Sequence, residues 1–267
     1  MKLRKALEKA KLEREEEIDE LVSSPPDRVS AVPGAGPDWQ APVYSESAHV
    51  PLDTQLLTAN RCVCISSAAP ELDYYKVLRT KILQKSKGQG WNTLMVTSAR
   101  PGEGKTLTSV NLALTLAREF NQTVLLVDCD LKKQDVHCRF GCKTDKGLGD
   151  FLLDGSCTVS EIMTWPGVDK MTLISGGQTI EGSTELLGSP RMRTLVAELK
   201  ERYPDRFVIF DVPSLLEGAD ALTCAPLVDG ILMVVRAGTT PAGDVKKALS
   251  MVPRDKLLGC ILNGQQR

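Results

Sequence analysis

Short runs of consecutive apolar residues alternate with longer amphipathic stretches through most of the chain. Five runs are nearly uninterrupted in apolar residues, at 93–97, 123–127, 207–210, 230–235 and 257–262. Such runs predict strands that are buried on both faces. Helical candidates lie near 74–86, 104–120, 190–202 and 241–252. The alternation predicts an α/β fold with a mostly parallel sheet flanked by helices on both faces, whose ligands bind at the carboxyl ends of the strands.

The first 60 residues have a different character from the rest. Residues 1–22 are rich in charge and contain neither glycine nor proline, which predicts an N-terminal charged helix. Two interpretations stay open: a solvated, frayed helix, or a helix that docks on a partner or on an anionic membrane surface. Residues 23–60 hold six of the fifteen prolines and predict a flexible linker. The remaining region, 61–267, is expected to form one folded domain.

Composition narrows the class of protein. Lys and Arg number 33 against 34 Asp and Glu, so the formal net charge is -1. This balance argues against a dedicated nucleic-acid binder. No apolar run approaches the roughly 20 residues that cross a bilayer, and the N-terminus has no apolar signal segment. The eight cysteines are scattered, which indicates reduced thiols. We expect a soluble, cytoplasmic protein that meets a membrane only peripherally.

A glycine-rich segment directly follows the first strong strand. Residues 99–106 read Ala-Arg-Pro-Gly-Glu-Gly-Lys-Thr and lead into a helical run, which is the context of a P-loop. Gly102 and Gly104 let backbone N–H groups converge on phosphate oxygens. Lys105 would neutralise phosphate charge, and the Thr106 hydroxyl would bind Mg²⁺. The expected nucleotide-binding set comprises Arg100, Pro101, Gly102, Glu103, Gly104, Lys105, Thr106, Leu107 and Asn263.

Carboxylates end two further predicted strands. Asp128 and Asp130 follow the run at 123–127, and Asp211 follows the run at 207–210. A divalent ion that bridges nucleotide phosphates prefers such oxygen ligands at the strand ends, so Thr106, Asp128 and Asp211 are the expected Mg²⁺ set. The alternative is that Asp128 and Asp130 only cap the following turn.

Taken in order, these segments resemble bacterial tyrosine kinases of the CpsD/CapB type. Residues 98–106, 124–132 and 208–213 are similar to the Walker A, A′ and B motifs of that family. Residues 73–80 are similar to the helix with which the family builds ring-shaped homo-oligomers. Further matching segments lie at 147–152, 185–192, 228–232 and 258–263. The resemblance covers about 70–267 and implies that 61–267 is a P-loop kinase domain.

The resemblance implies a function and a role for each site residue. The expected activity is ATP- and Mg²⁺-dependent phosphorylation of tyrosines, often of the protein's own copies. The expected partner is a Wzz-like membrane polysaccharide co-polymerase that controls capsule or exopolysaccharide export from the cytoplasmic face of the inner membrane. Lys105, Asp128 and Asp130 would be catalytic, with Asp128 orienting or deprotonating the attacking hydroxyl. Asn263 would lie near the adenine, and Arg100 would either reach a neighbour's phosphates or face solvent.

Several positions depart from the family pattern. The family's C-terminal tyrosine cluster has no counterpart in 264–267, so the resemblance does not locate the phosphoacceptor. Lys132, Asp73 and Lys76 stand where the family has Arg, Glu and Arg, and Ser214 replaces a proline. Lys keeps the charge of Arg but loses its bidentate geometry. The tail without tyrosine favours the alternative function, a nucleotide-switched ATPase similar to partition and division ATPases.

Overall fold

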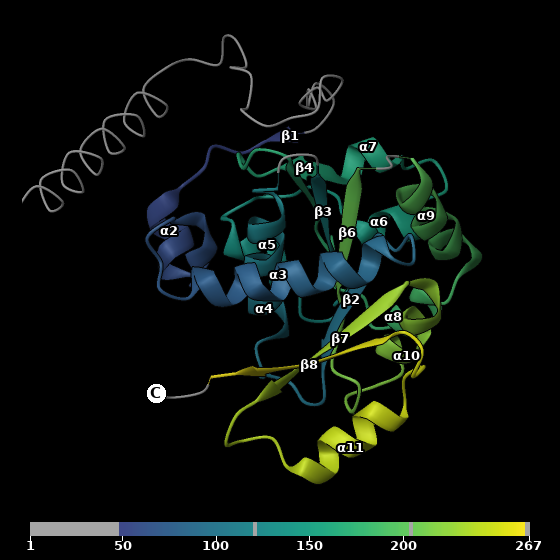
Figure 1. Ribbon diagram of the computed structural model, residues 1–267. Coiled ribbons are helices and arrows are strands. Elements are labelled where there is room, and N and C mark those ends of the chain that lie inside the picture. Colours follow the sequence, from purple (N-terminus) through teal and green to yellow (C-terminus); the bar gives the residue numbers. More distant parts are fainter. Residues whose placement is uncertain (1–47, 120–121, 203–204, 265–267) are drawn as a thin grey trace, which may run out of the picture. The chain divides into compact units, whose positions relative to one another are not determined.

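The folded region is built around one eight-stranded sheet. The structure, a computed structural model, describes residues 48–264 except 120–121 and 203–204. The strand order is β1-β4-β5-β3-β6-β2-β7-β8 (Figure 1). All neighbouring strands from β5 to β8 run parallel, β4 is antiparallel to β5, and β1 is parallel to β4. The carboxyl ends of β2, β3, β6, β7 and β8 therefore meet at one edge of the sheet.

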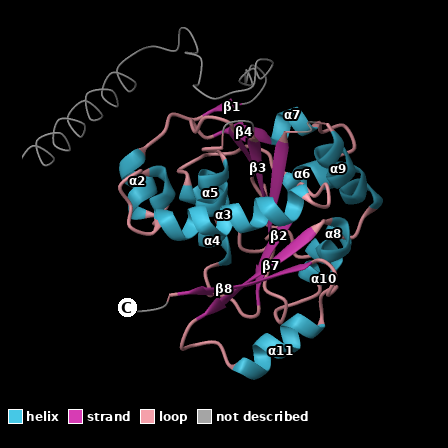
Figure 2. Cartoon of the chain, in the orientation of Figure 1, coloured by secondary structure: helices cyan, strands magenta, loops and turns pink. Residues whose placement is uncertain are grey.

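The elements alternate along the chain (Figure 2). The strands are β1 (Ala48–His49), β2 (Thr93–Ser98), β3 (Thr123–Asp128), β4 (Met163–Trp165), β5 (Met171–Ile174), β6 (Arg206–Asp211), β7 (Gly230–Arg236) and β8 (Leu257–Asn263). The α-helices are α2 (Thr54–Ala59), α3 (Leu72–Lys87), α4 (Lys105–Leu116), α5 (Val136–Arg139), α6 (Leu148–Leu153), α7 (Val159–Ile162), α8 (Ser183–Leu187), α9 (Pro190–Glu201), α10 (Asp220–Cys224) and α11 (Ala242–Ser250). Two 3₁₀ turns, η1 (Val63–Ile65) and η2 (Ala225–Leu227), complete the described part.

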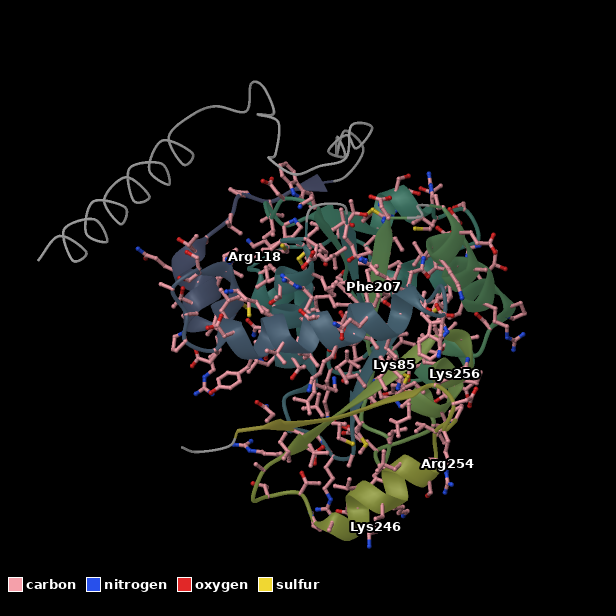
Figure 3. All side chains as sticks on the ribbon, in the orientation of Figure 1. Lys85, Arg118, Phe207, Lys246, Arg254 and Lys256 are labelled. Carbon is pink, nitrogen blue, oxygen red and sulfur yellow. The ribbon has the colours of Figure 1, made fainter. Side chains whose placement is uncertain are left out.

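Two hydrophobic cores lie on opposite faces of the sheet, because side chains along a strand alternate between its faces. Met95, Val127 and Phe210 pack with α6 to α11 on one face. Leu94 and Phe207 pack with α2 to α5 on the other, and Figure 3 labels Phe207 behind α3. Strands β2, β3 and β6 are buried along their whole length, which explains their continuous apolar sequences.

The predicted fold class is confirmed. All five predicted strands are present, as β2, β3, β6, β7 and β8, and the four predicted helices are α3, α4, α9 and α11. The helix α4 ends at Leu116, four residues before the predicted end. Among the described residues, none of the helices combines the length and apolarity needed to cross a membrane.

The predicted linker at 23–60 extends too far, because its last part is folded. β1 adds a strand to the sheet, and α2 begins after Asp53, whose carboxylate accepts the N–H groups of Gln55 and Leu56 at 3.0 Å each. Leu57 is fully buried in the core beside α3 and α4, and burial of such a side chain stabilises a short helix. The predicted helix at 1–22 and the rest of the linker lie outside the described residues.

Candidate nucleotide and phosphoryl-transfer site

The predicted P-loop connects β2 to α4 and has a defined conformation. Gly102 and Gly104 have φ angles of +77° and +97°, values that favour glycine. Glu103 is 3% exposed, and its carboxylate accepts the N–H of Ala99 at 2.9 Å and the hydroxyl of Thr240. This buried carboxylate closes the loop on itself and joins it to the segment after β7. Lys105 then opens α4, so the loop ends at a helix N-terminus.

The ends of β7 and β8 lie against the same loop. Arg236 and Asn263 are paired in register, and Asn263 Nδ2 donates to the carbonyl of Glu103 at 2.8 Å. Arg236 Nη1 donates to the carbonyl of Gly102 at 3.1 Å. A Cβ atom on Gly104 would lie 2.0 Å from Asn263 Nδ2, so any other residue there would require the Asn263 side chain to move. Asn263 is thus beside the P-loop, on the side where β8 ends.

Lys105 and Thr106 contact carboxylates at the ends of β3 and β6. Lys105 Nζ lies 2.8 Å from Asp130 Oδ2 and 3.7 Å from Asp211 Oδ2. The Thr106 hydroxyl donates to Asp211 Oδ2 at 2.7 Å, and the Ser109 hydroxyl donates to Asp211 Oδ1 at 3.0 Å. The structure therefore gathers residues that are more than 100 positions apart in the sequence at one edge of the sheet.

Asp128 is fully buried and organises the segment that carries Asp130. Its Oδ1 accepts the N–H of Asp130 at 3.0 Å, and its Oδ2 accepts the N–H groups of Asp135 and Val136 at 3.1 Å each. Burial and the neighbouring charge of Asp211 raise the pKa of Asp128 to about 7, despite these hydrogen bonds. Asp128 thus caps the following turn and also faces Asp211 across the β3–β6 pair.

Negative charge exceeds positive charge in this cluster. Three carboxylates, those of Asp128, Asp130 and Asp211, surround the single ammonium of Lys105. Burial lowers the pKa of Lys105, but the charges of Asp211 and Asp130 outweigh burial and hold it above its ordinary value. Burial raises the pKa of Asp211. Carboxylates and a hydroxyl with surplus negative charge are a donor set that fits Mg²⁺.

The other predicted site residues are placed less centrally. Arg100 is 57% exposed and pairs with Asp244 of α11, while Pro101 is exposed. Leu107 is half-buried in α4. Ser109 and Thr240 were missed, because hydroxyls within an apolar helix or after a strand have no distinctive spacing. Arg236 was missed too, although its position at the end of a predicted strand was the available signal.

Comparison with known proteins agrees with this geometry. The profile of the CobQ/CobB/MinD/ParA nucleotide binding domain (CbiA) matches residues 94–221. The tyrosine-protein kinase YwqD of Bacillus subtilis is 34% identical over 197 residues, a match that spans 73% of this chain and 81% of YwqD. The chain belongs to the family of bacterial tyrosine-protein kinases. CpsD of Streptococcus agalactiae, another tyrosine-protein kinase, is 30% identical over 72% of this chain and 82% of CpsD.

Solved structures of related proteins have the same fold as this chain. The kinase domain of Escherichia coli ETK superposes with a TM-score of 0.70 at 27% identity, covering 84% of this chain and 90% of that domain. The chimerical protein CapA2B2 has the same fold, with a TM-score of 0.71 at 23% identity over 85% of this chain and 96% of its own. The sequence-based assignment to a nucleotide-binding protein-tyrosine kinase family is therefore confirmed.

Proposed function

We propose that this protein transfers the γ-phosphoryl group of ATP, with Mg²⁺, to protein tyrosines. The observation that carries the proposal is the cluster at the P-loop, where Lys105 lies 2.8 Å from Asp130 and 3.7 Å from Asp211, and the Thr106 hydroxyl lies 2.7 Å from Asp211. Phosphoryl transfer depends mainly on positioning and on charge stabilisation, which such a cluster supplies. Membership in a family of tyrosine-protein kinases supports tyrosine as the acceptor.

Each residue has a role that follows from its place. The backbone of 100–107 would hold the phosphates, and Lys105 would move from Asp130 to their oxygens. Thr106, Asp211 and Asp128 would hold Mg²⁺, which neutralises the phosphate charge when bound. The sequence assigns the acceptor hydroxyl to Asp128, but we favour Asp130 to orient that hydroxyl and take up its proton, because Asp130 is slightly more exposed than the fully buried Asp128. Asp128 would assist by fixing the loop of Asp130.

The described tyrosines differ in their fitness as acceptors. Tyr74, in the first turn of α3, is 59% exposed. Tyr75 packs against the core, and burial raises the pKa of its hydroxyl. Tyr74 is therefore the acceptor that we favour within the described part, and acceptors on partner proteins would serve the same chemistry.

The proposed setting is capsule or exopolysaccharide production. The name of CapA2B2 joins a CapA component to CapB, and CapB of Staphylococcus aureus is a putative tyrosine-protein kinase, 27% identical to this chain. A CapA-like polysaccharide co-polymerase is accordingly the proposed membrane partner, at the cytoplasmic face of the inner membrane.

A homo-oligomeric ring through 73–82 of α3 is proposed as the assembly. Asp73 and Lys76 are exposed and pair with each other at 2.9 Å. Arg79, in contrast, turns inward to Glu119 at 2.7 Å and to the carbonyl of Thr115 at 2.9 Å. Asp73 and Lys76, like the exposed Lys81, are therefore placed to contact a neighbour, whereas Arg79 is not.

Intact mass measurement after incubation with ATP and Mg²⁺ tests the proposed activity. We expect added phosphate on tyrosines, mapped by peptide analysis, and none in a Lys105→Ala variant or without Mg²⁺. A tyrosine-containing peptide is included as an external acceptor. Lys105-dependent release of phosphate with no modified tyrosine on either acceptor would replace the kinase with the switch-type ATPase.

A further inference from the structure

A small pocket lined mainly by charged residues adjoins Asp130, the candidate catalytic carboxylate. Its walls are formed by Asp130, Lys132 and Lys133 on one side and by Pro213, Glu217 and Asp220 on the other. The first group follows β3 and the second follows β6, so the pocket lies across the same two strands that carry Asp128 and Asp211. An acceptor segment entering here would reach Asp130 directly.

The two pocket lysines are held in different ways. Lys132 lies 3.2 Å from Asp220, a carboxylate that is 2% exposed and also accepts the hydroxyls of Ser183, at 2.8 Å, and Thr184. Burial alone would raise the pKa of Asp220, but these partners outweigh it and lower the pKa. Lys132, whose side chain is 46% exposed, is thus paired with a buried carboxylate that links α8 to the start of α10.

Lys133 presents its charge at the pocket mouth instead. Its side chain is 70% exposed and pairs at 2.7 Å with Glu217, which is 35% exposed. An ion pair this exposed is weak, so another carboxylate can replace Glu217 at little cost. The backbone of Lys133 is nevertheless fixed, because its N–H donates to Asp130 Oδ1 at 3.0 Å. The cation therefore stands at a set place beside the carboxylate proposed to receive the tyrosine hydroxyl.

We propose that Lys133 is a specificity-determining residue, which binds a carboxylate flanking the acceptor tyrosine by displacing Glu217. The acceptor is then an acidic peptide segment. This inference rests on the proposed function, since it assigns the acceptor side of the same site. The displaced Glu217 turns to solvent, and the ammonium keeps one carboxylate partner throughout.

Direct binding to the full chain tests this inference without requiring turnover. Two fluorescent tyrosine peptides are compared by anisotropy in the presence of a non-hydrolysable ATP analogue and Mg²⁺, one with aspartates on both sides of the tyrosine and one with asparagines. We expect the acidic peptide to bind about two- to fivefold more tightly, the range that an exposed ion pair supplies. The preference should shrink as salt is raised.

Three variants assign the preference to the pocket. Lys133→Gln keeps the backbone N–H to Asp130 and should abolish the preference, whereas Glu217→Gln should increase the affinity for the acidic peptide. Lys146→Gln is the matched control, because Lys146 also forms a solvent-exposed pair at 2.7 Å, with Glu161, away from the pocket. Equal binding of both peptides by the wild type, or a preference that survives Lys133→Gln, overturns the inference. Phosphate transfer to the same peptides is scored separately, so binding without transfer rejects the kinase proposal and leaves the acidic-peptide site standing.

Discussion

Replacing Gly104 by alanine tests how closely β8 and the P-loop are fitted together. The new Cβ would lie 2.0 Å from Asn263 Nδ2 and 3.2 Å from its Cγ, at a residue whose φ is +97°. Asn263 must then move and lose its 2.8 Å bond to the Glu103 carbonyl. The left-handed backbone costs an alanine about 1–2 kcal/mol, and the lost hydrogen bond about 1 kcal/mol. We expect Gly104→Ala to lower the free energy of unfolding by about 2–3 kcal/mol.

Gly102 supplies a matched control for the backbone contribution. Its φ is +77°, but no atom lies within 4 Å of a Cβ placed there. Gly102→Ala should therefore cost only about 1–2 kcal/mol. In an Asn263→Ala background the clash at Gly104 disappears, and Gly104→Ala should cost the same as Gly102→Ala, a coupling of about 1 kcal/mol.

Urea unfolding of the nucleotide-free proteins, followed by circular dichroism, measures these differences. The reasoning is refuted if Gly104→Ala costs no more than Gly102→Ala, or if its cost is unchanged when Asn263 is removed. Either result would mean that the close approach of β8 to the P-loop does not exist in solution.

Three further expectations concern the site and α3. Because burial raises the pKa of Asp128 to about 7, the folded state keeps a proton that the unfolded state releases, and the free energy of unfolding should fall as pH rises from about 4 to about 7. Urea unfolding of the nucleotide-free protein should show a steeper fall in the wild type than in Asp128→Asn, and parallel slopes would contradict the assignment. Phosphopeptide mapping after incubation with ATP should find phosphate on Tyr74 and none on Tyr75, and the reverse distribution would rule out exposure as the deciding factor. Arg79→Ala should lower the free energy of unfolding by about 1 kcal/mol or more, because the side chain is paired and 17% exposed. Lys76→Ala should leave the free energy of unfolding within about 0.5 kcal/mol and reduce the oligomer mass in sedimentation, and equal effects of the two variants on stability would contradict their separate roles.

The central strands and the P-loop could be predicted from the sequence because their physics is local. Strands such as β3 and β6 are buried on both faces, and this leaves uninterrupted apolar runs. The P-loop requires two glycines, a lysine and a threonine in consecutive positions between a strand and a helix. Both signals lie within a dozen residues, so no tertiary information is needed to find them.

The elements that were missed depend on distant contacts. β4 has three residues and β5 four, too few for a periodic pattern, and both are fixed by neighbouring strands. α2 lies in a stretch that composition assigns to a linker, yet burial of Leu57 holds it in place. Within the site, the sequence assigns Glu103 to the nucleotide-binding loop but gives no partner for its carboxylate. Only the fold reveals that its carboxylate is buried against Ala99 and Thr240.

Because β8 lies at the end of the sheet, the part of the site that β8 carries should unfold locally more easily than the part carried by the central strands. Asp211 stands on β6 in the middle of the strand order and pairs with Lys105 of α4, whereas Asn263 stands on β8, which hydrogen-bonds to β7 at the end of the strand order. Leu262 beside it is 64% exposed. Local unfolding starts where few buried contacts oppose it. Amide protons of β8 should therefore exchange with solvent before those of β2 and β6. The contact between Asn263 and the P-loop should break first, while the cluster of Lys105 and Asp211 stays formed.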